Sequence, residues 1–204
     1  MEAAETRAVL AHTEELRQRA RADRRASSVP LITFGVIIML SAPFTYVPFG
    51  PLWRSEGLYW WVAVPVGFLA IAFWYRTRRI RTGIGSGRGA YVVAALASAL
   101  LLGFGLTWVF GGGPLGITGL ALLILAVVQR NAYLTACAAA LAVIGSMEND
   151  AMITDKANDI AVRIVGEPSH GGWLYGVPPL VQVLLGLTVL AAGLVALRNE
   201  RAAR

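Results

Sequence analysis

The sequence is short of the residues that stabilise small secreted domains or build metal clusters. It contains one cysteine, which cannot form an intramolecular disulfide or a thiolate cluster. Charged residues make up only 15% of its 204 residues, against about 25% in an average soluble domain. These shortages exclude a disulfide scaffold, a coiled coil and a disordered tail.

The chain is instead rich in apolar residues. Hydrophobic residues make up 56% of the sequence, and the mean hydropathy is +0.61. A water-soluble fold of this size could not bury so many apolar side chains, so the composition predicts an integral membrane protein. The net charge of +6 would suggest nucleic acid in a soluble protein. Here the basic residues lie at the ends of apolar segments, so we expect no nucleic-acid partner.

The apolar segments predict an all-α, polytopic transmembrane helix bundle. A spanning helix needs about 20 mostly apolar residues. Two of the segments are short, but fusing them would place Arg130 at the centre of one long helix, which costs about 2.5–3.5 kcal/mol on insertion scales. A tight turn at 129–131 avoids that cost. Six spans are therefore expected within a domain at 29–197, near 30–47, 58–75, 90–110, 115–128, 132–147 and 177–197.

The distribution of arginine predicts the orientation. Most basic residues fall on one side of the six-span arrangement, and the exceptions are Arg54, Lys156 and Arg163. Short cytoplasmic loops are enriched in Lys and Arg. We therefore expect a multi-pass protein of the cytoplasmic membrane with a cytoplasmic N-terminal helix at 1–28 and a cytoplasmic tail at 198–204. The N-terminal helix is expected either to lie solvated at the surface or to dock a partner or anionic lipid.

Small and aromatic residues predict how the spans pack. Helices in lipid approach closely where small residues recur four apart. Tryptophan and tyrosine prefer headgroup depth, which places Trp60 and Trp61 at the outer interface, with Trp74, Tyr75, Tyr91 and Tyr133 at the inner one. The candidate packing sets are Ala95, Ala99 and Gly103 in the third span, Ala132, Ala136 and Ala140 in the fifth, and Ala192 and Ala196 in the sixth.

The predicted spans contain no Asp, Glu, Lys, Arg or His. Proton relays and ion pathways usually need such residues, so this argues against a proton- or sodium-driven pump. Gln182 is the most costly polar side chain in a span, and we expect it to pair with another helix. No catalytic, cofactor-binding or metal-binding residue is identified.

The external loop at 148–176 contains most of the remaining polar residues. Apolar residues recur there at helical spacing, which predicts an amphipathic helix at the outer mouth of the bundle. The segment is either a solvated face, or a lid or partner-binding element. The acidic residues match no calcium loop. The candidate interaction or lid residues are Asp155, Asp159, Ile160, Arg163 and His170.

Four arginines follow the second span. Arg76, Arg78, Arg79 and Arg81 are candidates for contact with anionic lipid, which attracts such residues by about 1 kcal/mol each. Membrane topology alone also explains them. The glycines at 83–87 do not form a nucleotide-binding loop, because no strand precedes them.

The runs at 58–61, 65–69 and 74–76, after an arginine-rich N-terminus and Ser41-Ala42-Pro43, resemble uncharacterised multi-pass membrane proteins of high-GC bacteria. Similar proteins accompany winged-helix transcription regulators, which implies a regulatory or accessory context but no activity. We expect a non-enzymatic accessory, sensory or interaction protein. The alternative is a small transporter or permease component for an apolar or lipid-like compound, and an intramembrane enzyme comes third. The expected partners are membrane lipids and either another membrane protein or a second copy of the chain.

Overall fold

The computed structural model of the chain describes residues 27–45, 53–82, 88–104, 113–147 and 177–202. All regular secondary structure in these residues is α-helical, as the sequence predicts, and each helix overlaps one of the six apolar segments. The bounds are α2 Ser28–Thr45, α3 Trp53–Thr82, α4 Arg88–Gly103, α5 Pro114–Val128, α6 Ala132–Met147 and α8 Val177–Ala202. The helix predicted before Ser27 and the amphipathic helix predicted within 148–176 lie outside the described residues.

Two helices are longer than the sequence predicts. α3 extends past its expected segment at 58–75 in both directions, and α8 continues through the expected tail as far as Ala202. Arginine, glutamate and alanine are good helix formers, so the end of an apolar run does not end the helix. α4 is described to Gly103 as a helix, and the last residues of its predicted span, 105–110, lie outside the described part.

By length and composition, two helices are able to cross a membrane. These are the Gly57–Arg81 part of α3 and the Val181–Ala202 part of α8. The other four helices are apolar but shorter, namely Ser28–Phe44, Gly89–Gly103, Pro114–Val128 and Ala132–Met147. The arrangement with six spans therefore stays a prediction.

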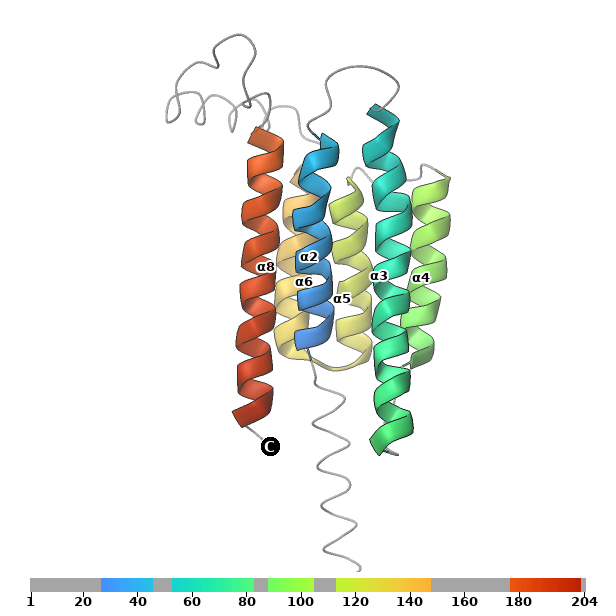
Figure 1. Cartoon of the computed structure of the whole chain (residues 1–204), viewed down its shortest axis with the longest axis vertical. Coiled ribbons are helices and arrows are strands. Elements are labelled where there is room, and N and C mark those ends of the chain that lie inside the picture. Colours follow the sequence, from blue (N-terminus) through green and yellow to red (C-terminus); the bar gives the residue numbers. More distant parts are fainter. Residues whose placement is uncertain (1–26, 46–52, 83–87, 105–112, 148–176, 203–204) are drawn as a thin grey trace, which may run out of the picture.

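The helices lie side by side and alternate in direction (Figure 1). Three antiparallel pairs make the main contacts, α2 with α8, α3 with α4 and α5 with α6, and α3 also packs on α2 and α5. The start of α2, the turn between α5 and α6 and the end of α8 consequently lie at the same end of the bundle. The first and last described helices are thus neighbours.

Glycines bring α2 and α8 into backbone contact. A Cβ atom on Gly35 would lie 2.7 Å from the backbone nitrogen of Leu190, and one on Gly186 would lie 2.7 Å from that of Met39. A Cβ on Gly193 would meet Ile32 in the same way. The sequence prediction named Ala192 and Ala196 for this helix. Ala196 is buried, but the closest contacts are made by the glycines.

The α5–α6 pair is equally close, and here the predicted face is wrong. A Cβ on Gly119 would lie 2.6 Å from the Cα of Ala142, and Gly145 lies against Gly116. The buried face of α6 consists of Leu134, Ala138, Leu141 and Gly145. Ala132, Ala136 and Ala140, the predicted packing set, are exposed. The glycines decide the face because they let the two backbones approach more closely than alanine does.

The predicted packing set of α4 does meet a neighbouring helix. Ala95 is buried, and the Trp61 indole N–H of α3 donates a hydrogen bond of 3.0 Å to the carbonyl oxygen of Ala99. A Cβ on Gly103 would lie 2.6 Å from the same indole nitrogen. The indole therefore lies against Ala99 and Gly103 of α4.

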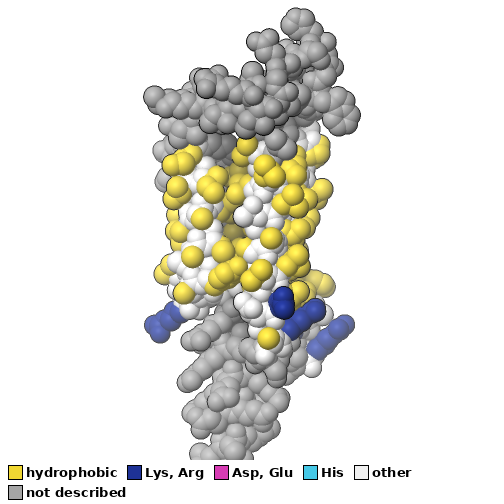
Figure 2. All heavy atoms as spheres, turned by 90° about the vertical axis from the view of Figure 1, so that its left-hand side faces the viewer, with side chains coloured by type: hydrophobic (Ala, Val, Ile, Leu, Met, Phe, Trp, Pro, Cys, Tyr) yellow, Lys and Arg dark blue, Asp and Glu magenta, His cyan; other side chains and the backbone are white. Residues whose placement is uncertain are grey.

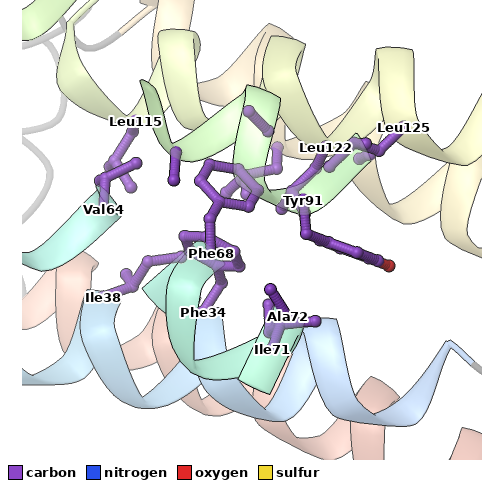
Figure 3. Packing of buried hydrophobic residues seen from close by; sticks show 14 of the residues in the cluster. Phe34, Ile38, Val64, Phe68, Ile71, Ala72, Tyr91, Leu115, Leu122 and Leu125 are labelled. Atoms are coloured by element: carbon purple, nitrogen blue, oxygen red, sulfur yellow. The ribbon is translucent and has the colours of Figure 1, made fainter. Parts of the chain in front are cut away.

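A large apolar core joins α2, α3, α4, α5 and α6 (Figure 3), and a smaller cluster forms around Leu31, Ala126 and Leu134. The rings of Phe34 in α2 and Phe68 in α3 lie 4.7 Å apart between centroids, and Leu122 of α5 belongs to the same cluster. Trp60 and Tyr91 are each only 1% exposed, so these two aromatic side chains pack within the bundle. Their predicted depth at the membrane interface stays a prediction.

Candidate functional site

The charged residues of the described helices lie toward the two ends of the bundle. The C-terminal ends of α3 and α8 and the α5–α6 turn lie at one end of the bundle. Figure 2 shows basic side chains below a broad apolar band. We call this the arginine end, defined by Arg76, Arg78, Arg79, Arg81, Arg130, Arg198 and Arg201. It is the only part of the predicted site that the described residues include.

Aromatic side chains accompany the arginines of α3. The Arg78 guanidinium lies 5.3 Å from the centroid of the Trp74 ring, one helical turn earlier, which is a cation–π distance. The rings of Tyr75 and Tyr91 stack with centroids 5.5 Å apart, and the Tyr91 hydroxyl lies 3.4 Å from the side-chain oxygen of Gln129. The close of α3 is thereby held against α4 and the α5–α6 turn.

The α5–α6 turn forms where the sequence predicts it. The Arg130 backbone has φ of 54°, in the left-handed region. The N–H of Arg130 donates to Val127 and that of Asn131 to Ala126, both at 3.0 Å, which is the Schellman pattern that ends a helix. The Asn131 side-chain oxygen then accepts the N–H of Leu134 at 3.1 Å and so caps the start of α6. Two helix ends are satisfied within three residues.

A carboxylate joins the two ends of the described chain. The side chain of Glu200, near the end of α8, accepts the backbone N–H of Ser27 at 2.8 Å and that of Ser28 at 3.0 Å. The Ser28 hydroxyl donates to its second oxygen at 2.7 Å. Both serines are buried. We call this arrangement the Glu200 contact. It satisfies N–H groups that have no partner within α2, and it places a negative charge at the positive end of the helix dipole.

A second polar contact joins α2 and α8 toward the opposite end. The Ser41 hydroxyl lies 2.8 Å from the side-chain oxygen of Gln182 and 2.7 Å from the carbonyl oxygen of Ile38. Gln182 is only 2% exposed. This confirms the prediction that Gln182 pairs with another helix. Close by, the Tyr59 hydroxyl of α3 donates to the carbonyl oxygen of Ile37.

Most other hydroxyl groups of the helices bond to their own backbone. Ser98 donates to Ala95 at 3.0 Å, and Thr118 to Pro114 at 2.8 Å. The same pattern recurs in Thr135, Ser146 and Thr188. These groups are therefore occupied by bonds that any buried or lipid-facing helix needs.

The other predicted site residues are not placed. Asp155, Asp159, Ile160, Arg163 and His170 all lie outside the described residues, within 148–176. In the five described segments, no three His, Cys, Asp or Glu side chains come together.

Sequence reasoning missed the Glu200 contact. Two serines directly before Val29-Pro30 are a typical helix-start signal, which could have pointed to a cap at this position. The acceptor, however, is 172 residues away from Ser28. No local pattern identifies a cap that arrives from the other end of the chain.

No protein family, curated protein or solved structure matches the chain.

Proposed function

We propose that the chain is a six-span protein of the cytoplasmic membrane, with both ends cytoplasmic, and that it acts as a non-enzymatic accessory, sensory or interaction protein. The observation that carries this proposal is the division of its surface. All six described helices carry exposed apolar side chains, and Figure 2 shows an apolar band with basic side chains below it.

The exposure of the long helices supports a membrane environment. A core helix of a soluble protein is mostly buried. In contrast, only 33% of the most apolar stretch of α3 is buried, and only 22% of the most apolar stretch of α8. Large side chains such as Phe73, Val93 and Leu96 are more than half exposed. Apolar surface of this extent is stable in lipid and costly in water.

The short α5–α6 pair is compatible with spanning. The 15 residues of α5 extend over about 22 Å, against a hydrocarbon core of about 30 Å. Thinning of the bilayer and flanking polar residues accommodate a short span at modest cost. The basic turn at Arg130 then lies on the same side as the C-terminal ends of α3 and α8, in agreement with the positive-inside rule.

The polar contacts favour an interaction role over a transporter. A transport path needs polar groups or space between helices, yet α2 touches α8 and α5 touches α6 backbone to backbone. Ser41 and Gln182 bind each other, and the remaining hydroxyl groups described above bind their own helices. Within the described residues, the arginine end is the part that offers polar groups for recognition, and the N-terminal segment and the external loop add to it.

Topology reporters test the membrane part of the proposal. A fluorescent protein that folds only in the cytoplasm is fused to the C-terminus, and alkaline phosphatase, active only outside, is fused there in a second version. We expect a bright first fusion, a silent second one, and a chain that stays in the membrane fraction at alkaline pH. The reverse reporter pattern would make the number of spans odd.

The non-transport part is tested in proteoliposomes. We expect an imposed proton or sodium gradient to drive no uptake across a panel of amino acids, sugars and amphipathic cations. Gradient-driven uptake that Gln182→Leu abolishes would refute the interaction role.

A further inference from the structure

The outward face of α3 continues past the apolar segment into the arginines. Its exposed apolar side chains recur at intervals of four and three residues, which is one side of a helix. They are Val62 at 50% exposure, Val66 at 54%, Leu69 at 48%, Phe73 at 68% and, after a gap, Ile80 at 75%. The gap in this stripe is position 76.

Arg76 fills that gap. It is three residues after Phe73 and four before Ile80, so it occupies the same side of α3, and it is exposed. Arg79, also exposed, lies three residues further along and is its helical neighbour. Two guanidinium groups thus project from an outward face that is apolar on both sides of Arg76.

The carboxylate described at this end is already engaged. Glu200 uses both side-chain oxygens on Ser27 and Ser28. The sequence from 57 to 147 contains arginines and no acidic residue, so α3, α4, α5 and α6 offer Arg76 and Arg79 no carboxylate there. Among the described residues at this end, no carboxylate is left to balance Arg76 and Arg79, and an anion from the surroundings can take that place.

We propose that Arg76 and Arg79 bind the phosphate of an anionic phospholipid. This inference rests on the proposed membrane placement, in which the side of α3 that carries Phe73 and Ile80 faces lipid. An arginine between two lipid-facing apolar side chains lies where acyl chains meet headgroups, the depth of the phosphodiester. Guanidinium groups bind phosphate oxygens in bidentate fashion.

The neighbouring Trp74 supports this depth. It is 40% exposed, and its ring lies under the Arg78 guanidinium. Tryptophan prefers the membrane interface, so α3 crosses from acyl chains to headgroups within the turn that leads to Arg78. A zwitterionic lipid would bring its own cation against the two arginines, so the site selects a net negative headgroup such as phosphatidylglycerol.

The experiment compares two double variants of the full chain that have the same charge. R76Q/R79Q removes the proposed site, and R198Q/R201Q removes two exposed arginines of α8 from the same end. Each purified protein is titrated with phosphatidylglycerol or phosphatidylcholine, and bound lipid is measured by native mass spectrometry. An attraction of about 1 kcal/mol for each arginine corresponds to about a fivefold change in affinity. R76Q/R79Q should therefore bind phosphatidylglycerol about 25-fold more weakly than the wild type. R198Q/R201Q should stay within about threefold of the wild type, because its two arginines do not belong to the proposed site and attract the lipid only through screened charge.

Three results would overturn the proposal: equal losses in the two variants, no loss in R76Q/R79Q, or equal binding of both lipids by the wild type. Equal losses would indicate attraction by net charge alone. Circular dichroism of both variants confirms that the helices have formed. Alkaline extraction of the wild type separates this inference from the proposed function, because a chain released from membranes contradicts the function, whereas an integral chain with equal variants contradicts only the site.

Discussion

The Glu200 contact makes a prediction that the sequence alone does not. Glu200→Ala removes the acceptor of two backbone N–H groups and of the Ser28 hydroxyl. Ser27 and Ser28 are 5% and 1% exposed, so water replaces the lost carboxylate poorly. The substitution should therefore loosen the start of α2 from the end of α8.

The expected size follows from the bonds that are lost. Removing a helix cap costs about 0.5–2 kcal/mol, and a hydrogen bond to a charged group contributes about 1.5–3 kcal/mol. The Glu200 side chain is half-buried, which reduces the second figure. We expect Glu200→Ala to lower the free energy of unfolding by about 2–3 kcal/mol. Glu200→Gln keeps one acceptor oxygen and loses the charge, so about 1 kcal/mol is expected for it.

The assay is reversible unfolding of the full chain by sodium dodecyl sulfate in mixed micelles, followed by circular dichroism. Arg201→Ala is the matched control, since Arg201 is the next residue of α8 and is exposed. A double-mutant cycle with Ser28→Ala isolates the hydroxyl bond, for which we expect a coupling of about 1 kcal/mol. If Glu200→Ala destabilises the chain no more than Arg201→Ala does, the contact contributes nothing and the reasoning is refuted.

The same assay checks three further substitutions and one control, Gly57→Ala. Gly119→Ala should cost about 1–3 kcal/mol because its Cβ would strike the α6 backbone, whereas Gly57→Ala, with nothing within 4 Å, should cost nothing. Gln182→Leu should cost about 0.6–1.7 kcal/mol, the range of interhelical hydrogen bonds in membranes, and no change would mean that Ser41 is satisfied by Ile38 alone. Arg130→Gly should stabilise the chain by about 1 kcal/mol by relieving its positive φ, and a loss of stability would contradict the turn described here.

The breaks between helices were predictable because each has a local cause. α6 occupies the predicted segment at 132–147, and α5 begins one residue earlier than predicted, at Pro114. The cost of burying Arg130 and the glycines before Pro114 both act within a few residues. The C-terminal ends of α3 and α8 were not predictable. Arginine and glutamate are good helix formers that also occur in loops, so they do not mark where a helix ends.

The packing faces were predicted less well than the helices. In α6 the alanines are so frequent that a four-residue spacing exists on more than one side, and the sequence prediction chose the exposed one. Gly145 marks the correct side because it can touch Gly116 without a side chain between them. Which of the two small-residue faces of α6 packs against a neighbour depends on where the partner helix lies. The sequence of α6 alone does not specify the position of that partner.

In the candidate site, too, features with a local cause in the sequence were predicted, and features that depend on a distant residue were not. Arg76 and Arg79 were predicted in the loop after the second span, whereas they lie within α3, and the outward stripe of that helix gives their surroundings. Gln182 was predicted to pair because a buried amide is costly alone, although its partner Ser41 could not be named. The Glu200 contact joins residues from opposite ends of the chain, and local sequence rules do not reach that far.

The polar and small residues of α2 and α8 together fix one register for the pair. Met39 meets Gly186 and Ile32 meets Gly193, with Ser41–Gln182 beyond one end of this row and the Glu200 contact beyond the other. A slip of one helical turn would place larger side chains where Gly186 and Gly193 now lie. It would also separate both polar contacts at once, leaving buried groups without partners. In a bilayer, where apolar contact hardly distinguishes helix from lipid, such coincident constraints determine the partner of a helix. The first and last described helices are therefore paired by specific contacts, and the apolar surface alone would not select that pairing.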